Sequence, residues 1–384
     1  MRTAELDVAV LSTVHDAADA RLHRVCAALV AQGLSVGLWA TGRSEHGPAS
    51  VVVRTLPRRG LARRMARAIA LPVSVRAPVQ IVVDPELLPP ALAVARLRGT
   101  AVVADVHEDY RRLLDDRPWA RGAAGLLGRL VADGATVAAR HADVTVVADE
   151  HLRPRRARHR LVVRNLPPPG SLPAPSTRDA VPRAVYVGDV RRSRGLVAMV
   201  DAVLAAAPWE LDIVGPVSDE DRAWVASRTG GTGRVRMHGR QPPTATWQLA
   251  RGAWVGLALL EPTPAFVRAV PTKLYEYLAS GLAVVTTDLP GMRHMVEGSA
   301  AGLVVTGAED CAAVLRGWHR DPATLDVHRS AATAWARQAA AGVDPFTVLA
   351  TTVAALRPSP LRQATPAGSA ATPPELDHGG AETT

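Results

Sequence analysis

This sequence is poor in several residue types that mark whole classes of protein. Only two of its 384 residues are cysteine, and no Cys and His residues have the spacing of a zinc site, so neither a disulfide framework nor a structural zinc is predicted. Aromatic residues make up 4% of the chain, which leaves few rings for stacking on bases and disfavours nucleic acid as a partner. No apolar run reaches the roughly 18 residues of a membrane-spanning helix, and the first residues lack a signal-peptide pattern. We therefore expect a cytoplasmic protein.

Lysine is almost absent as well. Lys273 is the only lysine, and the other 44 basic residues are arginines. An ammonium is a compact, mobile charge whereas a guanidinium is a planar fork, so a lone lysine indicates a position where geometry matters. Lys273 stands where a helix is expected to begin after an apolar strand, and a helix N-terminus beside a cation binds anions well. An ordinary solvated lysine explains the charge alone equally well.

Short apolar strands alternate with amphipathic helical segments along most of the chain, and they form two series. The first series has strands expected at 6–13, 34–40, 51–54, 79–84, 100–105 and 144–147, and the second at 183–187, 211–214, 235–237, 255–259, 282–286 and 303–305. A segment rich in proline, serine and alanine separates the two series and reads as a linker. The pattern predicts an α/β protein with two Rossmann-like, doubly wound domains.

The helix that contains Lys273 carries two further polar side chains on the same face. Lys273, Glu276 and Ser280 stand at positions i, i+3 and i+7. A cation and a carboxylate in the first turns suit a ligand that offers both phosphate and sugar hydroxyls. A surface ion pair between Lys273 and Glu276 would give the same spacing.

The segment from Pro271 to Gly291, PTKLYEYLASGLAVVTTDLPG, resembles the nucleotide-sugar-binding segment of retaining glycosyltransferases of the GT-B fold, family 4 type. The likeness is greatest to bacterial members that build surface polysaccharides. It implies that Glu276 holds the ribose hydroxyls of a donor nucleotide and that Lys273 and the helix N-terminus lie towards its diphosphate. Many members carry a second glutamate eight residues before the first, where this chain has Arg268.

Two other segments resemble the same family in the expected order. Tyr186 to Leu196 is similar to the first strand and turn of the C-terminal domain, where Gly188 opens the turn and Arg194 takes the position of a basic residue that grips the diphosphate. Members often have arginine directly after that glycine; this chain has Asp189, and Arg191 or Arg192 is a candidate substitute. Gly188, Arg192, Arg194, Lys273 and Glu276 are thus the predicted nucleotide-sugar-binding residues.

The loop from Ala104 to Tyr110 resembles the family's strand-end loop that faces the donor, and it contains His107. The resemblance implies that His107 approaches the transferred sugar. Neighbouring carboxylates at Asp105, Glu108 and Asp109 are able to orient its ring, although Asp109 is equally placed to cap the next helix. A lone histidine at a strand end is also typical of a purely structural hydrogen bond.

The excess of positive over negative charge is confined to the first half of the chain. Residues 1–165 hold 25 arginines and 16 acidic residues, whereas residues 166–384 are neutral overall. Residues 51–83 contain seven arginines and no acid, and an apolar stripe runs along the helix expected there, formed by Leu61, Met65, Ala68 and Ile69. This pattern favours peripheral contact with an anionic membrane, and a solvated helix face is the alternative.

The resemblance implies a GT-B architecture with an acceptor-side domain at 1–165, a linker at 166–182, a donor-binding domain at 183–343 and a helix at 344–356 that crosses back to the first domain. Residues 357–384 are poor in large apolar side chains and are expected to be disordered. The implied activity is transfer of a sugar, with retention of configuration, from a nucleotide-diphosphate donor to a glycan or polyprenyl-linked acceptor in cell-surface polysaccharide synthesis.

Catalysis would then depend on His107, Arg194 and Lys273, because charge on the departing diphosphate must be stabilised. No metal or cofactor is predicted, since the acids at 105–109 lack the DxD spacing of a metal-bridged diphosphate site. Two alternatives stay open: a nucleotide-sugar epimerase on the same fold, and a non-catalytic scaffold subunit of a polysaccharide assembly complex. A dinucleotide-dependent dehydrogenase is disfavoured because no GxGxxG follows a strand.

Overall fold

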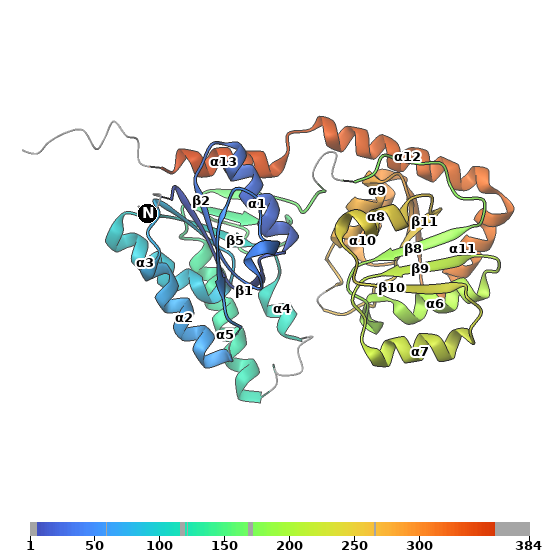
Figure 1. The fold of residues 1–384 in the computed structure, drawn as a ribbon, viewed down its shortest axis with the longest axis horizontal. Coiled ribbons are helices and arrows are strands. Elements are labelled where there is room, and N and C mark those ends of the chain that lie inside the picture. Colours follow the sequence, from blue (N-terminus) through green and yellow to red (C-terminus); the bar gives the residue numbers. More distant parts are fainter. Residues whose placement is uncertain are drawn as a thin grey trace, which may run out of the picture.

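A computed structural model describes residues 6–357 apart from 59, 116–119, 121, 168–171 and 265. The tail predicted at 357–384 lies outside the described residues except for Arg357. The described chain forms two α/β lobes side by side, each built around one parallel sheet (Figure 1). The two predicted series of strands correspond to these two sheets.

The first sheet has the strand order β3-β2-β1-β4-β5-β6-β7. Its strands are β1 (Val8–Asp16), β2 (Val36–Thr41), β3 (Val52–Leu56), β4 (Val79–Val82), β5 (Ala101–Val106), β6 (Val144–Val147) and β7 (Arg160–Val162). Both faces are covered, because alternate side chains of a strand point to opposite faces. Val8 and Val10 pack with α1 (Ala20–Ala31) and α13 (Pro345–Ala355). Ala9 and Leu11 pack with α2 (Leu61–Ser74), α3 (Leu88–Arg98) and α5 (Gly122–Ala139).

Strand β7 is the one element of this sheet that the sequence did not indicate. It has three half-buried residues at the sheet edge and lies within an arginine-rich segment, so it shows no apolar run. Arg160 is nevertheless fixed there, since its guanidinium donates to the carbonyl of Pro154 at 3.0 Å. The other connections of this lobe are η1 (Ser44–His46), η2 (Pro85–Leu87) and α4 (Tyr110–Asp115).

The second sheet has the strand order β10-β9-β8-β11-β12-β13. Its strands are β8 (Arg183–Val187), β9 (Glu210–Val214), β10 (Val235–Gly239), β11 (Val255–Ala258), β12 (Ala283–Thr287) and β13 (Gly302–Val305). Helices α6 (Leu196–Ala205), α7 (Asp219–Thr229) and α11 (Ala308–Arg320) pack on one face. Helices α8 (Pro243–Ala250), α9 (Thr272–Ala279), α10 (Pro290–Ser299) and α12 (Pro322–Ala341) pack on the other. The short η3 (Arg192–Arg194) precedes α6.

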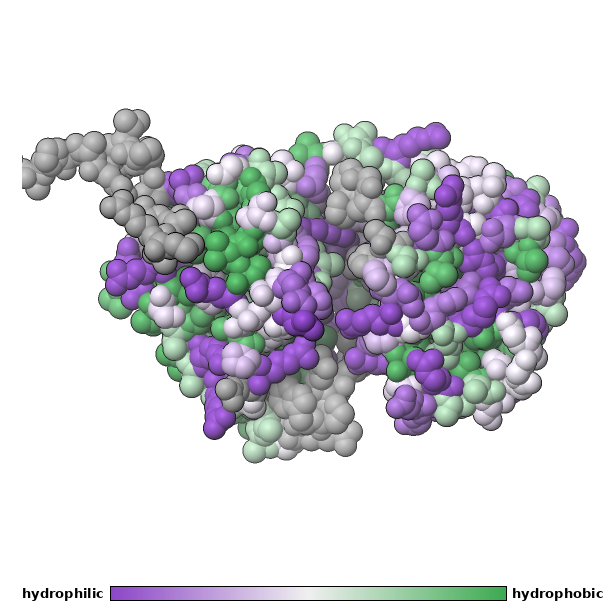
Figure 2. Space-filling view, viewed as in Figure 1, coloured by the Kyte–Doolittle hydropathy of each residue, from purple (hydrophilic) through white to green (hydrophobic). Residues whose placement is uncertain are grey.

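The last two helices connect the lobes. Helix α12 lies along the second lobe, and α13 lies beside α1 on the first lobe (Figure 1). Phe346, Leu349 and Val353 of α13 are buried in the core of the first sheet. The chain therefore begins and ends its described part on the same lobe, and the carboxyl ends of β5 and β8 lie on either side of the groove between the lobes. Hydrophilic residues flank this groove on the face shown in Figure 2.

The described helices include none that is both long enough and apolar enough to cross a membrane. Cys26 and Cys311, the two cysteines, are both buried as free thiols.

Candidate active site

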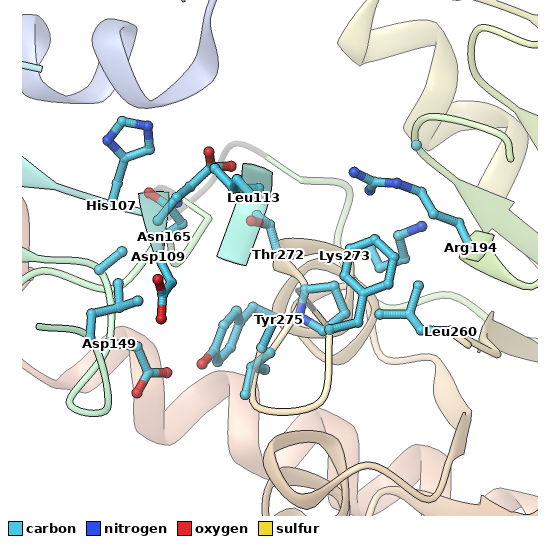
Figure 3. A pocket seen from close by; sticks show the side chains of 18 of the residues that line it. His107, Asp109, Leu113, Asp149, Asn165, Arg194, Leu260, Thr272, Lys273 and Tyr275 are labelled. Atoms are coloured by element: carbon cyan, nitrogen blue, oxygen red, sulfur yellow. The ribbon is translucent and has the colours of Figure 1, made fainter. Parts of the chain in front are cut away.

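A cavity of about 480 Å³ lies between the two lobes. Its lining includes His107, Gly188, Arg194, Lys273 and Glu276, so five of the six predicted site residues meet in one place. Figure 3 shows His107, Asp109, Asp149 and Asn165 on the side of the first lobe and Arg194, Lys273 and Tyr275 on the other. A cavity of this size and position is typical of a site for a small polar ligand.

Lys273 is the most unusual residue of the cavity. Its side chain is buried, with 5% of its surface exposed, yet its Nζ has no hydrogen-bond partner among the described residues. The ammonium lies 3.4 Å from the centre of the Tyr186 ring, which gives it a cation–π contact but leaves its three donors free. Burial lowers the pKa of Lys273 well below its ordinary value, and the charge of Arg194 lowers it further. Such a group gains most from a ligand that brings negative charge.

Gly188 leaves room for this ammonium. It has a φ of +131°, and a Cβ at this position would lie 3.2 Å from the Nζ of Lys273. The residue thus meets two demands that only glycine satisfies well, a left-handed backbone and close approach of a charged side chain.

Arg194 supplies a second cation next to Lys273. Its Nε is buried without a hydrogen-bond partner, at 3.8 Å from the Oδ2 of Asp189. Its guanidinium lies over the ring of Phe266, 5.4 Å from the centre. Two cationic side chains with buried, unbonded donors in one cavity favour an anion, because an ionised donor without a hydrogen bond carries a desolvation cost that an anion relieves.

Glu276 stands one turn after Lys273 on α9, and the position of this helix is set by Tyr277. The backbone N–H of Val187 donates to the hydroxyl of Tyr277 at 2.9 Å, and Gly256 allows the ring to lie directly against β11. Burial raises the pKa of Glu276, while the charges of Arg24 and Lys273 oppose the rise. The helix begins at Pro271 without a side-chain cap, so its first N–H groups stay available to a ligand.

His107 follows β5 and is oriented by a residue that the sequence did not single out. Its Nε2 lies 3.1 Å from the Nε2 of His15, and the Nδ1 of His15 lies 2.9 Å from the Oδ1 of Asp84. Burial lowers the pKa of His15, but its hydrogen bond to Asp84 and the charge of that carboxylate outweigh this and raise the pKa to about 9. His15 is therefore protonated at neutral pH and donates to His107, whose own pKa is lowered chiefly by burial.

The expectation that a nearby carboxylate orients His107 is wrong. The Nδ1 of His107 lies 3.4 Å from the backbone carbonyl of Asp105, and Asp109 accepts a hydrogen bond from the backbone N–H of Arg112. Asp109 thus caps the following helix, the alternative that its position also allowed. The carboxylate of Asp105 is taken instead by the guanidinium of Arg21, which donates to both oxygens at 2.8 Å.

Arg192, the sixth predicted site residue, does not line the cavity. Its guanidinium lies 3.3 Å from Asp221 and over the ring of Trp224 at 5.6 Å, on the side of η3 away from Lys273. The two side chains leave the turn in different directions, and only that of Arg194 lines the cavity. Arg191, the other suggested substitute, pairs with Asp189 at 2.7 Å.

Sequence reasoning missed His15, Asp84 and Arg24. His15 lies at the carboxyl end of β1 and Asp84 follows that of β4, and the two strands are neighbours in the sheet. The rule that ligands gather at the carboxyl ends of parallel strands indicates this edge of the sheet, but the pairing of the two residues depends on the strand order. Arg24 was hidden in the arginine-rich composition; its NH1 is buried without a partner.

Comparison with protein families gives a match over residues 181–321 to the family described as Glycosyl transferases group 1. This region contains β8, Arg194 and α9. The chain is a glycosyltransferase. No curated protein sequence matches the chain.

Solved structures with the same fold include several glycosyltransferases. Sucrose-phosphate synthase from Thermosynechococcus elongatus is 16% identical, with a TM-score of 0.70 over 93% of this chain and 99% of that one. WaaG, a glycosyltransferase involved in lipopolysaccharide biosynthesis, is 16% identical with a TM-score of 0.66, over 91% and 99%. HepE from Anabaena in complex with UDP-glucose is 13% identical with a TM-score of 0.65, over 91% and 100%. The predicted GT-B fold is confirmed.

Proposed function

We propose that this glycosyltransferase is a retaining enzyme of the family 4 type. It moves a sugar from a nucleotide-diphosphate donor to a glycan or lipid-linked acceptor in cell-surface polysaccharide synthesis. The observation that carries the proposal is that two cationic side chains, Lys273 and Arg194, line one cavity between the lobes with buried donors, Nζ and Nε, that have no hydrogen-bond partner among the described residues. A sugar diphosphate supplies the anion that these groups lack.

Different residues of the cavity lining bind different parts of the donor. Lys273, Arg194 and the first N–H groups of α9 bind the diphosphate, and Gly188 leaves space for it beside the ammonium. Glu276, one turn further along the helix, accepts hydrogen bonds from the ribose hydroxyls. Negative charge builds on the diphosphate as the glycosidic bond breaks, so donors held ready in a buried site stabilise the transition state more than the ground state.

His107 lies across the cavity from Lys273 and Arg194 (Figure 3), on the side where this proposal places the transferred sugar. Because His15 donates to its Nε2, the neutral ring of His107 carries its proton on Nδ1, which lies 3.4 Å from the carbonyl of Asp105. In this proposal His107 exchanges that long contact for a hydrogen bond to the transferred sugar, and no proton transfer by His107 is required.

Among the solved structures of this fold, HepE has been seen with UDP and with UDP-glucose, and WaaG acts in lipopolysaccharide biosynthesis. These likenesses support a nucleotide-sugar donor and a surface glycan as product class.

Peripheral contact with an anionic membrane, at the cytoplasmic face, is part of the same proposal. On α2, Leu61 and Ile69 are 51% and 61% exposed. The predicted apolar stripe is divided, however, because Ala68 is fully buried against the sheet. Arg64 is also engaged within the lobe, as its Nε donates to Glu86 at 2.6 Å. The membrane-facing part of α2 is thus narrower than the sequence suggested.

Incubation of the purified protein with UDP-, GDP- and ADP-sugars tests the proposal, with release of nucleoside diphosphate measured with and without a lipid-linked acceptor. Acceptor-dependent release with retained configuration is expected. A converted free sugar nucleotide would indicate the epimerase, and binding without turnover would indicate the scaffold; either result contradicts the proposal. Glu276→Ala should weaken nucleotide binding at least tenfold.

A further inference from the structure

A second cavity, of about 630 Å³, adjoins the first. Glu108, Asp109, Arg112 and His151 line both, so the two are continuous. The donor residues Lys273, Arg194 and Glu276 line only the first. The second cavity therefore opens from the sugar end of the donor site, on the side of the first lobe.

Arginine dominates this second cavity. Five arginines and three acids line it: Arg111, Arg112, Arg153, Arg155, Arg268, Glu108, Asp109 and Asp133. Arg111 and Arg112 are neutralised within the lobe by Asp133 and Asp109. The guanidiniums of Arg153, Arg155 and Arg268 form no ion pair or hydrogen bond with any described residue. Three guanidinium groups without partners thus line the second cavity, and the one of Arg268 belongs to the second lobe.

An apolar helix face leads away from the same cavity. Asp133 and Val137 of α5 line it. Leu126 and Leu130 stand at the positions that continue this face, since residues three or four apart share one side of a helix. Leu126, Leu130 and Val137 are 61%, 61% and 54% exposed. Large apolar side chains this exposed, in a row that starts at a charged hollow, match a ligand with a charged head and an apolar chain.

We propose that the second cavity is the acceptor subsite, and that the acceptor is a phosphorylated amphiphile. Arg153, Arg155 and Arg268 bind its phosphate, and its apolar chain lies along Leu126 and Leu130 of α5. The assignment of the cavity to an acceptor rests on the proposed function, because only a donor in the first cavity makes the second an acceptor site. Arg268 would then explain why the chain has arginine where many family members have glutamate, because the second lobe contributes this residue to acceptor binding.

Calorimetric titration of the full chain tests this, using monododecyl phosphate below its micelle concentration, with and without UDP. Inorganic phosphate and dodecyl maltoside are the matched probes that carry only the anion or only the chain. Monododecyl phosphate is expected to bind at least tenfold more tightly than either. Equal binding of dodecyl maltoside would overturn the anion site, and equal binding of inorganic phosphate would overturn the apolar track.

Arg153→Ala/Arg155→Ala and Arg268→Ala should each weaken monododecyl phosphate binding roughly tenfold or more, as expected for loss of charge-assisted hydrogen bonds. Arg156→Ala is the control, since Arg156 is exposed in the same segment but does not line the cavity. Leu126→Gln/Leu130→Gln should weaken monododecyl phosphate and leave inorganic phosphate unchanged, with Leu97→Gln, 86% exposed on α3, as control. Wild-type affinity in the arginine variants overturns the proposal.

Thermal unfolding and UDP binding of every variant separate this proposal from the donor assignment. Variants that bind UDP normally but lose monododecyl phosphate support the acceptor subsite. If UDP fails to bind while monododecyl phosphate still depends on the three arginines, the donor assignment fails and the amphiphile site stands.

Discussion

The two lobes beside the donor cavity differ in whether their buried charged groups have hydrogen-bond partners within the protein. On the first lobe, Arg21 donates to both oxygens of Asp105 and to the carbonyl of Val163 and the side chain of Asn165. Asp84 is bound by His15 and by the hydroxyl of Ser12. On the second lobe, Lys273 Nζ and Arg194 Nε are buried with no hydrogen-bond partner among the described residues. The Arg21–Asp105 and His15–Asp84 pairs are thus satisfied within the protein, whereas we infer that a ligand satisfies Lys273 and Arg194.

This difference separates structural charge from functional charge. A buried ion pair with satisfied hydrogen bonds fixes geometry, because removal of either partner strands the other. A buried cation without a partner destabilises the fold and persists where binding requires it. Burial, which both sets of groups share, does not distinguish them; the unpartnered donors of cationic side chains that line the cavity do.

The largest effect is expected from removing one partner of the buried Arg21–Asp105 pair on the first lobe. Arg21→Met leaves the Asp105 carboxylate, buried and 2% exposed, without its cation. The free energy of unfolding should fall by about 3–5 kcal/mol, as for other buried pairs that lose one partner. Denaturant titration measures this. The surface pair gives the control: Arg58→Met, whose guanidinium lies 3.0 Å from Asp16 at an exposed site, should change stability by less than about 0.5 kcal/mol. Equal losses in both variants would contradict the distinction.

The next largest effect is a pH dependence of the free energy of unfolding, which arises from the His15–Asp84 pair on the same lobe. The pKa of His15 is raised to about 9 from 6.5, so its protonation contributes stability that is fully present below pH 6.5 and is lost as pH rises through 9. The loss should be on the order of 3 kcal/mol. His15→Gln should flatten the stability profile between pH 6.5 and 9.

Asp84, the acidic partner of His15, gives a second pH dependence at acidic pH. Its pKa is lowered from 3.8 because the bonds to His15, Thr13 and Ser12 outweigh burial, so its contribution is present above pH 3.8 and is lost as pH falls through the lowered value. The two shifts describe one interaction and do not add. A wild-type profile that is flat from pH 6.5 to 9 would show that His15 is not held as a cation by Asp84.

Replacing Lys273 on the second lobe should change the free energy of unfolding in the opposite direction. Lys273→Met replaces an unpartnered buried ammonium by an apolar chain of similar length, and the free energy of unfolding at pH 7 should rise by about 1–2 kcal/mol. Because burial lowers the pKa of Lys273, the gain should shrink as pH rises towards 10.5. UDP affinity should fall at least tenfold at the same time.

Arg329→Met is the matched control for this substitution. Arg329 is buried in the same lobe, but its guanidinium donates to the carbonyls of Ala253 at 2.7 Å and Ser176 at 2.6 Å. This variant should lose stability, because two buried carbonyls lose their donor. A loss of stability in Lys273→Met comparable with that of Arg329→Met would mean that the lysine is structural.

The sequence could predict the fold because strand order and burial follow from local pattern. Val8 to Leu11 and Val255 to Leu259 are apolar runs that only a doubly covered parallel sheet accommodates. Helical spacing put Lys273 and Glu276 on one face, and the family resemblance implied that both face the donor; both line the cavity. The sequence could not distinguish Arg192 from Arg194, since both belong to one turn and their directions depend on φ and ψ within η3. Nor could it pair His15 with Asp84, whose contact depends on β1 and β4 being neighbours although 69 residues apart.

That contrast within η3 gives the smallest expected effect and the most local test. Arg192→Ala should change UDP affinity less than twofold, because its guanidinium is engaged with Asp221 on the far side of the turn. Arg194→Ala, two residues away, should weaken UDP binding about tenfold or more, because it removes a cation whose Nε is free in the cavity. Both changes remove one positive charge from the same segment, so long-range electrostatics is matched between them and the difference measures contact alone. Equal losses in the two variants would assign the donor affinity to overall charge, and the partnerless Nε of Arg194 would then say nothing about where the diphosphate binds.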